Sequence, residues 1–437
     1  MPRFRGGMRL MHRLLHGIRQ ALQSPSRTTR TAVVLGRLLG AAFLLCFATG
    51  LYSHFLQNPL PWMTFPTRPT WLYQLTQGVH ITAGLVCLPL ILGKLYAVYP
   101  ELFRTPPITG LRSLLERASI ALLVAASLVE IAIGLLNTYQ WYRLFPFPFR
   151  QTHFALSFVI IGSLAIHIAV KLDLIALHWR RPAAGVEAAA PAPAAAVGAV
   201  TPAAAGAATR APARRGDAGR GVTGRVFAWI DRTPAPRSPR VSRRGFLTTI
   251  GVASATLVAL TAGQSFRPLD ALTVFAPRKP GVGPGGLPVN RTAAAARVTE
   301  TARAGDWALT VMAGGSSRAL SLADLRSLPQ HTVSLPIACV EGWSQLAEWQ
   351  GVRVKDLLAL VGSPASVRVR VRSLEQGSLY AMSELEPEFV RDDLTLIALR
   401  LNGHVLDLDH GYPARLIAPA RPGVLQTKWL STVEVIG

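Results

Sequence analysis

Five long apolar segments dominate the N-terminal part of the chain. They cover Val33–Tyr52, Gln77–Tyr96, Ser119–Leu136, Ala155–Leu174 and Phe246–Ala262. The first four are close to the roughly 20 residues that a helix needs to cross the hydrocarbon core of a bilayer. The pattern predicts an all-α bundle of four transmembrane helices over residues 32–181. A fifth, anchoring transmembrane helix is expected over residues 242–265.

Residues 289–437 show a different pattern, in which short alternating runs are separated by turn residues. Trp307–Val311, Val367–Val371 and Thr395–Leu399 alternate as strands do, whereas Ser321–Leu328 and Val354–Leu360 are typical of short helices. The sequence therefore predicts a strand-rich α+β domain after the membrane helices.

Two polar stretches separate these units. Residues 182–241 are dominated by Ala, Pro, Gly and Arg, and they contain too few large apolar side chains to offset the entropy of ordering. We expect a disordered cytoplasmic linker there. Residues 266–288 form a second, shorter spacer that is rich in Pro and Gly.

The charge of the chain is +23 at pH 7, and half of its 437 residues are apolar. The arginines cluster in short loops and in the linker, so the charge indicates membrane orientation and lipid contact, and a nucleic-acid partner is not expected. Seven of them precede the first apolar segment: Arg3, Arg5, Arg9, Arg13, Arg19, Arg27 and Arg30. We expect a multi-pass protein of the cytoplasmic (inner) membrane, with residues 1–31 and the linker cytoplasmic and the C-terminal domain periplasmic.

The fifth apolar segment is preceded by Ser242, Arg243 and Arg244. Paired arginines directly before a moderately apolar run are typical of a twin-arginine export signal, which carries proteins that fold before crossing the membrane. No small-residue cleavage site is evident, so we expect this segment to remain as an anchor. Two ordinary flanking arginines on a fifth helix are the alternative.

Two histidines lie near the starts of predicted membrane helices. An ionisable side chain is costly there and is expected to have a function. His80 and His153 lie near the starts of two segments that run in the same direction, and therefore at the same depth. Two imidazoles at one level can provide both axial ligands of a b-type haem. A pair of hydrogen-bonding histidines in a helix bundle is the alternative.

Three further polar side chains in these segments are open to more than one interpretation. His167 follows His153 by 14 residues and lies about 40° from it around the helix and about 21 Å deeper, which is the geometry for a second haem. The equivalent position after His80 is Lys94, so a purely structural histidine is equally well supported. Three roles are open for His54: haem ligand in place of one of the two histidines, participant in quinone chemistry, or interfacial residue. Two are open for Glu130: proton carrier or ion-pair partner.

Cys339 is one of three cysteines, and a disulfide framework is not expected because Cys46 and Cys87 lie in apolar segments. Cys339 begins the run Cys339–Ser344, which is followed by Trp349–Val352. Together with the later runs His410–Pro419 and Gln426–Trp429, this segment resembles the sulfite-oxidase superfamily of molybdopterin enzymes. The resemblance is closest to the branch of the bacterial periplasmic protein-methionine-sulfoxide reductase catalytic subunit, and it covers about 290 to 437.

The resemblance implies a molybdopterin cofactor and a set of residues that hold it. Cys339 would be the catalytic thiolate ligand of molybdenum, since soft sulfur ligands suit this metal. The residues that would contact the pterin or its phosphate are Asn290, Ser373, His410, Arg415, Gln426, Thr427 and Lys428.

These observations predict a membrane-bound molybdenum oxidoreductase that exchanges electrons with quinone through one b-type haem, or two. Reduction of an S-oxide or N-oxide, small or protein-bound, is favoured because the arginine-rich stretch after the metal cysteine of animal-type sulfite oxidases is absent. The alternative is that electrons flow in the opposite direction and the protein oxidises sulfite or another sulfur compound. A cytochrome b with a non-catalytic molybdenum-type module is the other alternative, favoured by a compressed region between Glu375 and Leu394.

Overall fold

The computed structural model describes residues 24–103, 108–141, 144, 147–177, 241–262 and 265–436. Most of the N-terminal arginines and nearly all of the predicted linker lie outside the described residues. The expectations for those two segments therefore stay predictions.

Five long helices form the N-terminal part of the structure, as the apolar pattern predicts. They are α2 (Thr29–Gln57), α3 (Leu72–Val98), α4 (Leu111–Thr138), α5 (Phe149–Leu177) and α7 (Arg243–Thr261). All five are long and apolar enough to cross a membrane. Large apolar side chains such as Leu38, Leu122 and Leu172 are more than half exposed on their outer faces, which suits contact with lipid.

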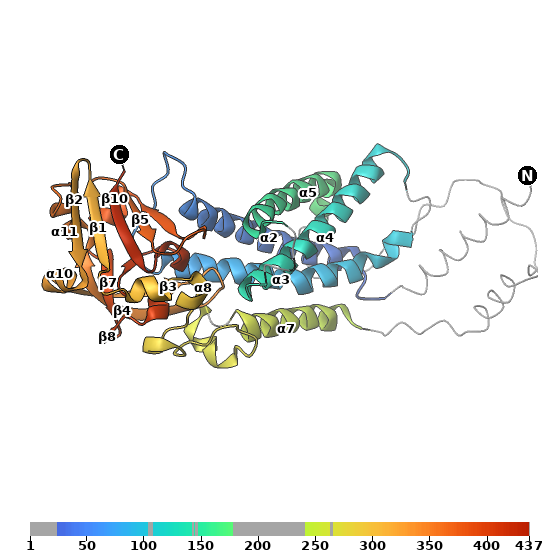
Figure 1. Ribbon diagram of the computed structural model, residues 1–437. Coiled ribbons are helices and arrows are strands. Elements are labelled where there is room, and N and C mark those ends of the chain that lie inside the picture. The colour runs from blue at the N-terminus through green and yellow to red at the C-terminus, as the bar shows by residue number, and fades with distance from the viewer. Residues whose placement is uncertain are drawn as a thin grey trace, which may run out of the picture.

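The helices pack in pairs, α2 with α3 and α4 with α5, and α7 lies along α3 (Figure 1). The N-terminal half of α7 meets the end of α3, where a Cβ on Gly93 would lie 2.9 Å from Ile250. Beyond its C-terminus, Phe266 meets the start of α3, where a Cβ on Gly78 would lie 3.3 Å from the Phe266 ring. The helix α7 is therefore antiparallel to α3, and its C-terminal end lies on the side of the C-terminal domain.

The C-terminal domain contains two β-sheets, at the end of the helix bundle (Figure 1). The first has the order β2-β1-β10-β5-β6 and the second β3-β4-β7-β8, with β9 also paired to β7. The strands are β1 (Ala308–Ala313), β2 (Ser316–Ser321), β3 (His331–Ala338), β4 (Ser344–Arg353), β5 (Val369–Ser373), β6 (Met382–Leu385), β7 (Leu396–Leu401), β8 (His404–Val405), β9 (Arg415–Ile417) and β10 (Leu430–Val435). The short helices α8 (Ala293–Ala296) and α9 (Thr299–Arg303) precede β1, and α10 (Leu322–Ser327), α11 (Val354–Ala359) and α12 (Pro387–Arg391) lie between strands.

Strand β7 of the second sheet is buried on both faces over Leu396–Leu399, and its sequence is therefore almost entirely apolar. Successive side chains of a strand point to opposite faces. Ile397 and Leu399 pack in a core shared with the first sheet and α11, whereas Leu396 and Ala398 pack in a second core with Trp343. The mixed α/β domain that the sequence predicts is confirmed, and the second of these cores contains Cys339.

The core of the C-terminal domain extends into the ends of the membrane helices. Leu56 of α2, Phe65 of the following loop and Tyr73 of α3 are buried in the same apolar cluster as the first sheet. Arg68 adds a two-pronged ion pair with Asp392, at 2.6 and 2.9 Å. The two parts of the chain therefore share one packed interface at the C-terminal end of α2 and the N-terminal end of α3.

The end of the Pro/Gly-rich spacer also packs against the domain. Nε2 of His410 lies 2.8 Å from the carbonyl oxygen of Pro284 and 3.0 Å from that of Leu287, so this nitrogen carries the hydrogen and donates it. Leu287 is fully buried in the second core. Burial and the neighbouring cations Arg415 and Lys428 lower the pKa of His410 to about 4, so the ring is neutral at pH 7.

Replacing Gly351 with alanine should destabilise the domain. A Cβ at this position would lie 2.0 Å from the carbonyl oxygen of Ile397, at the irregular point where β4 pairs with β7. Overpacking of this kind costs about 1–3 kcal/mol or more. Thermal unfolding of the purified chain should start at a lower temperature in Gly351→Ala than in the control Gly305→Ala, whose Cβ would meet no atom within 4 Å. Equal melting temperatures would contradict this packing.

Because His410 is neutral in the folded chain, the free energy of unfolding should fall as the solution becomes acidic. Its pKa is lower in the folded chain than the ordinary 6.5, so the unfolded chain binds more protons between pH 6.5 and 4. The contribution of His410 to the free energy of unfolding is complete above pH 6.5. It falls by about 3 kcal/mol as the pH falls through 4. Melting curves between these pH values should lose less stability in His410→Gln than in the wild type. Parallel pH profiles would show that His410 does not titrate as inferred.

Candidate molybdopterin site

Cys339 lies in the tight loop that joins β3 to β4. The pairing of these strands ends at Ala338 and Ser344, and the Cys339 amide donates to the carbonyl oxygen of Trp343 at 2.9 Å. The amide of Gly342 then donates to the carbonyl oxygen of Cys339 at 3.1 Å. Gly342 has a φ of +100°, which a residue with a side chain rarely adopts, so the glycine allows this turn.

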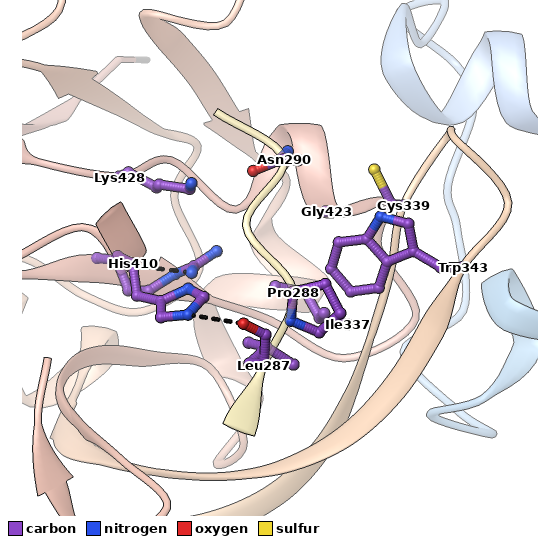
Figure 2. Close-up of a pocket in the computed structure, with 10 residues that line it drawn as sticks. Leu287, Pro288, Asn290, Ile337, Cys339, Trp343, His410, Gly423 and Lys428 are labelled. Atoms are coloured by element: carbon purple, nitrogen blue, oxygen red, sulfur yellow. Dashed lines mark hydrogen bonds between the residues drawn. The ribbon is translucent and has the colours of Figure 1, made fainter. Parts of the chain in front are cut away.

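A cavity of about 280 Å³, including the part open to solvent, lies beside this loop. Figure 2 shows Cys339 and Trp343 on one side of it and His410 and Lys428 on the other. Of the residues that the sequence predicts for the site, five line this cavity: Cys339, Asn290, His410, Arg415 and Lys428. The remaining lining residues are Leu287, Pro288, Ile337, Trp343 and Gly423.

Arg415 and Lys428 bring two basic groups to the cavity, of which Arg415 is buried and Lys428 is partly buried. The guanidinium of Arg415 donates to the carbonyl oxygens of His410 and Gln426, but its Nε has no partner among the described residues. Nζ of Lys428 donates to the carbonyl oxygens of Arg291 and Asp409 at 2.9 and 2.8 Å. Burial lowers the pKa of Arg415 to about 9, and burial followed by repulsion from Arg415 lowers that of Lys428 to about 7.

A glycine brings these two cations together. Gly411 has a φ of +107°, and a Cβ there would lie 3.0 Å from Cβ of Lys428 and 3.1 Å from Cβ of Arg415. Buried cations are stable when they are paired with an anion. An unpartnered Arg415 nitrogen beside a second cation therefore suits a phosphate group, and a thiol at the other side of the cavity suits a soft metal. The donor set fits a molybdopterin cofactor.

The other three predicted residues lie behind the cavity and hold its backbone. Ser373 donates from Oγ to the carbonyl oxygen of Lys428 at 2.8 Å. Thr427 hydrogen-bonds through its hydroxyl to that of Ser383 at 2.7 Å, and Nε2 of Gln426 donates to the carbonyl oxygens of Ala418 and Arg421. All three therefore position the turn that carries Lys428, and their direct contact with a cofactor stays a prediction.

Sequence reasoning missed the role of Glu341, two residues after Cys339. Its carboxyl group is buried and accepts hydrogen bonds from Gln140, from Nε of Arg278 at 3.3 Å and from Nε1 of Trp343 at 3.0 Å. Burial raises the pKa of Glu341. An acidic residue two positions after the predicted metal ligand was the signal in the sequence. It could not identify the partners of Glu341, because Gln140 and Arg278 are distant from it in the chain.

Cys339 itself is 2% exposed. Burial raises the pKa of its thiol, and the Glu341 carboxyl group raises it further. Only the thiolate is an effective metal ligand, and a bound cation favours that form. The Cys339 thiol is therefore protonated at neutral pH unless a cation is bound beside it.

The structure brings together the two histidines that the sequence predicts as haem ligands. The ring centres of His80 on α3 and His153 on α5 are 6.1 Å apart. Each ring packs near a glycine of a neighbouring helix, since a Cβ on Gly50 would lie 3.0 Å and one on Gly134 3.7 Å from the respective Cε1 atoms. Glycine at both positions leaves room beside the rings.

The Nδ1 atoms of both rings face polar groups of other helices. Nδ1 of His80 is 2.9 Å from the carbonyl oxygen of Cys46, and Nδ1 of His153 is 3.2 Å from Oε1 of Glu130. Metal-binding histidines commonly use one nitrogen in this way and bind the metal with the other. Glu130, which the sequence leaves open between proton carrier and ion-pair partner, lies next to His153.

The remaining polar residues of the bundle do not form an equivalent pair. Lys94 donates to the carbonyl oxygen of Ala32 at 2.9 Å, and the Nδ1 atom of His167 is buried without a hydrogen-bond partner among the described residues. The ring of His54 stacks on that of Phe154 with centres 3.7 Å apart. The second haem stays a prediction.

Comparison with known proteins identifies the C-terminal domain. Residues 295–437 match the family described as oxidoreductase molybdopterin binding domain. Among curated relatives, sulfite oxidase of Arabidopsis thaliana is 29% identical over 152 residues, which are 27% of this chain and 39% of that protein. Mitochondrial sulfite oxidase of Mus musculus is 30% identical over 152 residues, covering 28% of this chain and 27% of that protein.

Two further similarities extend the comparison. A putative protein-methionine-sulfoxide reductase subunit of Azospira oryzae is 28% identical over 120 residues, which are 27% of this chain and 44% of that protein. The solved structure of the sulfane dehydrogenase SoxCD of Paracoccus pantotrophus matches with 23% identity and a TM-score of 0.28, over 30% of this chain and 38% of that chain. The chain thus spans less than half the length of each of these four proteins. Its C-terminal part is a molybdopterin oxidoreductase domain homologous to sulfite oxidases, joined to five long apolar helices.

Proposed function

We propose that the protein is a membrane-bound molybdenum oxidoreductase that reduces an S-oxide or N-oxide with electrons from the quinone pool. Electrons would enter through a b-type haem between His80 and His153 and reach a metal held by Cys339. The observation that carries the proposal is the cavity that Cys339 lines together with the buried Arg415 and the partly buried Lys428. When bound, the molybdenum cofactor supplies two-electron oxygen-atom transfer.

The chain's own residues would bind and orient the cofactor. Cys339 would donate its thiolate sulfur, while Arg415 and Lys428 would hold the pterin phosphate through charge-assisted hydrogen bonds. Asn290 and His410 line the same cavity and would contact the pterin. The buried Trp343 would exclude water from the side of the cavity next to Cys339.

The proposal that the protein reduces an oxide, and does not oxidise sulfite, rests on the charge of the residue near the metal ligand. Glu341 is an acid that follows Cys339 by two residues, and its carboxyl group gives an anionic substrate such as sulfite no favourable charge. A neutral S-oxide or N-oxide has no such disadvantage. Sulfite oxidation remains the second candidate, because several curated relatives are named sulfite oxidases.

The proposed topology places the C-terminal domain outside the cytoplasm. Several basic residues lie at the opposite ends of the helices, among them Arg112 at the start of α4, Lys171 near the end of α5, and Arg243 and Arg244 at the start of α7. Basic residues favour the cytoplasmic side. A twin-arginine signal at Arg243 and Arg244 is compatible with this orientation, since the domain would cross the membrane folded.

Cys339→Ala should lower the molybdenum content and abolish turnover while the haem spectrum is kept. The thiolate is lost, whereas His80 and His153 are unchanged. Metal analysis of the purified protein and oxidation of the reduced haem by a panel of S-oxides and N-oxides measure the two properties. Cys87→Ala, a buried cysteine of α3, serves as the control and should keep both. Turnover by Cys339→Ala would refute the assignment of the metal ligand, and haem reduction by sulfite would favour the second candidate function.

His80→Ala and His153→Ala should each remove the absorption bands of a b-type haem, because each change removes one axial ligand. Reduced-minus-oxidised spectra of membranes measure this, with the exposed His404→Ala on β8 as the control. Part of the signal should be lost in His167→Ala only if a second haem is present. A full haem signal in both His80→Ala and His153→Ala would contradict the proposed electron path.

A further inference from the structure

The loop that follows Cys339 is hydrogen-bonded by three different segments on the membrane side. Three consecutive residues each accept a side-chain hydrogen bond from one of these segments. The pairs are Gln77 Nε2 to the Val340 carbonyl oxygen at 3.3 Å, Gln140 Nε2 to the Glu341 carboxyl group, and Ser265 Oγ to the Gly342 carbonyl oxygen at 2.5 Å. The three donors come from the start of α3, from the residues after α4 and from the residues after α7.

These segments also pack closely on one another. Gly78 of α3 lies so near to Ser265 that an added Cβ would be 3.2 Å from Cβ of Ser265. Tyr139, beside Gln140, donates from its hydroxyl to the carbonyl oxygen of Phe275 at 2.5 Å. The side of the Cys339 loop that faces the membrane helices is therefore covered by a continuous, hydrogen-bonded layer. We call the residues Gln77, Gln140 and Ser265 the membrane-side wall.

The wall reaches two of the segments that line the cavity. Besides Glu341, Nε2 of Gln140 donates to the carbonyl oxygen of Asn290 at 3.1 Å. Glu341 is held on its other side by Arg278 and Trp343, and its side chain is 2% exposed. To open this side of the site, the chain would have to break hydrogen bonds to a buried carboxyl group, and such bonds are among the stronger ones in proteins.

We propose that the membrane-side wall restricts the substrate to small S-oxides or N-oxides and excludes an S-oxide carried by a folded protein. This inference rests on the proposed function. A folded protein presents its side chains on a broad surface, and on the membrane side of the Cys339 loop such a surface would collide with α3 and the Gln140 segment. A small oxide needs only the opening of the cavity itself.

The accessibility of Cys339 tests the wall without turnover. The full-length chain is prepared from a host that makes no molybdenum cofactor, and Cys339 labelling is followed by mass spectrometry of its peptide. N-ethylmaleimide, the small reagent, should label Cys339 much faster than the same maleimide group attached to a long polymer, the bulky reagent. In Gln140→Ala the bulky reagent should label about tenfold faster, as expected when a hydrogen bond to a charged group is lost. Gln74→Ala, one turn before Gln77 on α3, is the control and should behave as the wild type.

Equal labelling of the wild type by the small and the bulky reagent would overturn the proposal. So would an unchanged bulky-reagent rate in both Gln140→Ala and Gln77→Ala. Both outcomes concern the wall alone, because no reaction at molybdenum is involved.

Substrate competition tests the size limit in the loaded protein. Reduced protein should be reoxidised by dimethyl sulfoxide or free methionine sulfoxide but far more slowly by a folded protein whose surface methionines have been oxidised. Similar rates with the free amino acid and the folded protein would refute the restriction. Failure of every oxide to reoxidise the protein would instead refute the proposed function, and the labelling result would still decide whether the wall exists.

Discussion

The shared core between the C-terminal domain and the ends of α2 and α3 is the constraint on which the rest of the structure depends. Leu56, Phe65 and Tyr73 are buried with the first sheet, so the domain cannot rotate freely on its membrane anchor. His80 lies seven residues after Tyr73 on the same helix, and Gln77 between them contacts the loop of Cys339. The distance between the histidine pair and the cysteine is therefore fixed by packing.

The cavity beside Cys339 combines features that would be unfavourable in an ordinary domain. The buried Arg415 and the partly buried Lys428 have carbonyl oxygens as their hydrogen-bond acceptors, and the carboxyl group of Glu341 is buried on the other side of the loop. Each such group costs free energy unless a partner compensates it. The folding energy of the two sheets has to support this arrangement, which explains why the site lies next to the fully buried Trp349 and strand β7.

Local patterns in the sequence predicted most of the elements. Membrane helices are a matter of length and composition, and β5 alternates visibly while β7 is a short apolar run. These elements were therefore predicted in the right places, although α4 begins eight residues before the predicted Ser119. The end of the spacer was predicted to be separate from the domain, but Leu287 is buried in it and His410 binds it. Nothing local in the Pro/Gly-rich segment indicates that packing.

Sequence motifs predicted the residues of the candidate site that lie within those motifs. Cys339, Arg415 and Lys428 line one cavity, whereas Ser373 supports the cavity from behind. The part played by Gln140 could not be predicted, because 201 residues separate it from Glu341 and no spacing or periodicity relates the two. Contacts between distant segments are decided by tertiary packing and leave no repeat in the sequence.

The ion pair of Arg68 with Asp392 joins residues that are 324 positions apart, and this separation sets an order of assembly. Chains are synthesised from the N-terminus, so the loop after α2 exists long before its acidic partner. Until then Leu56 and Phe65 have no apolar surface to cover them, and the nascent protein exposes apolar side chains at the end of α2 and in the loop that follows it. Closure of the interface is consequently a late event in biogenesis, and a chain that stops before β7 is left with an unprotected surface prone to aggregation.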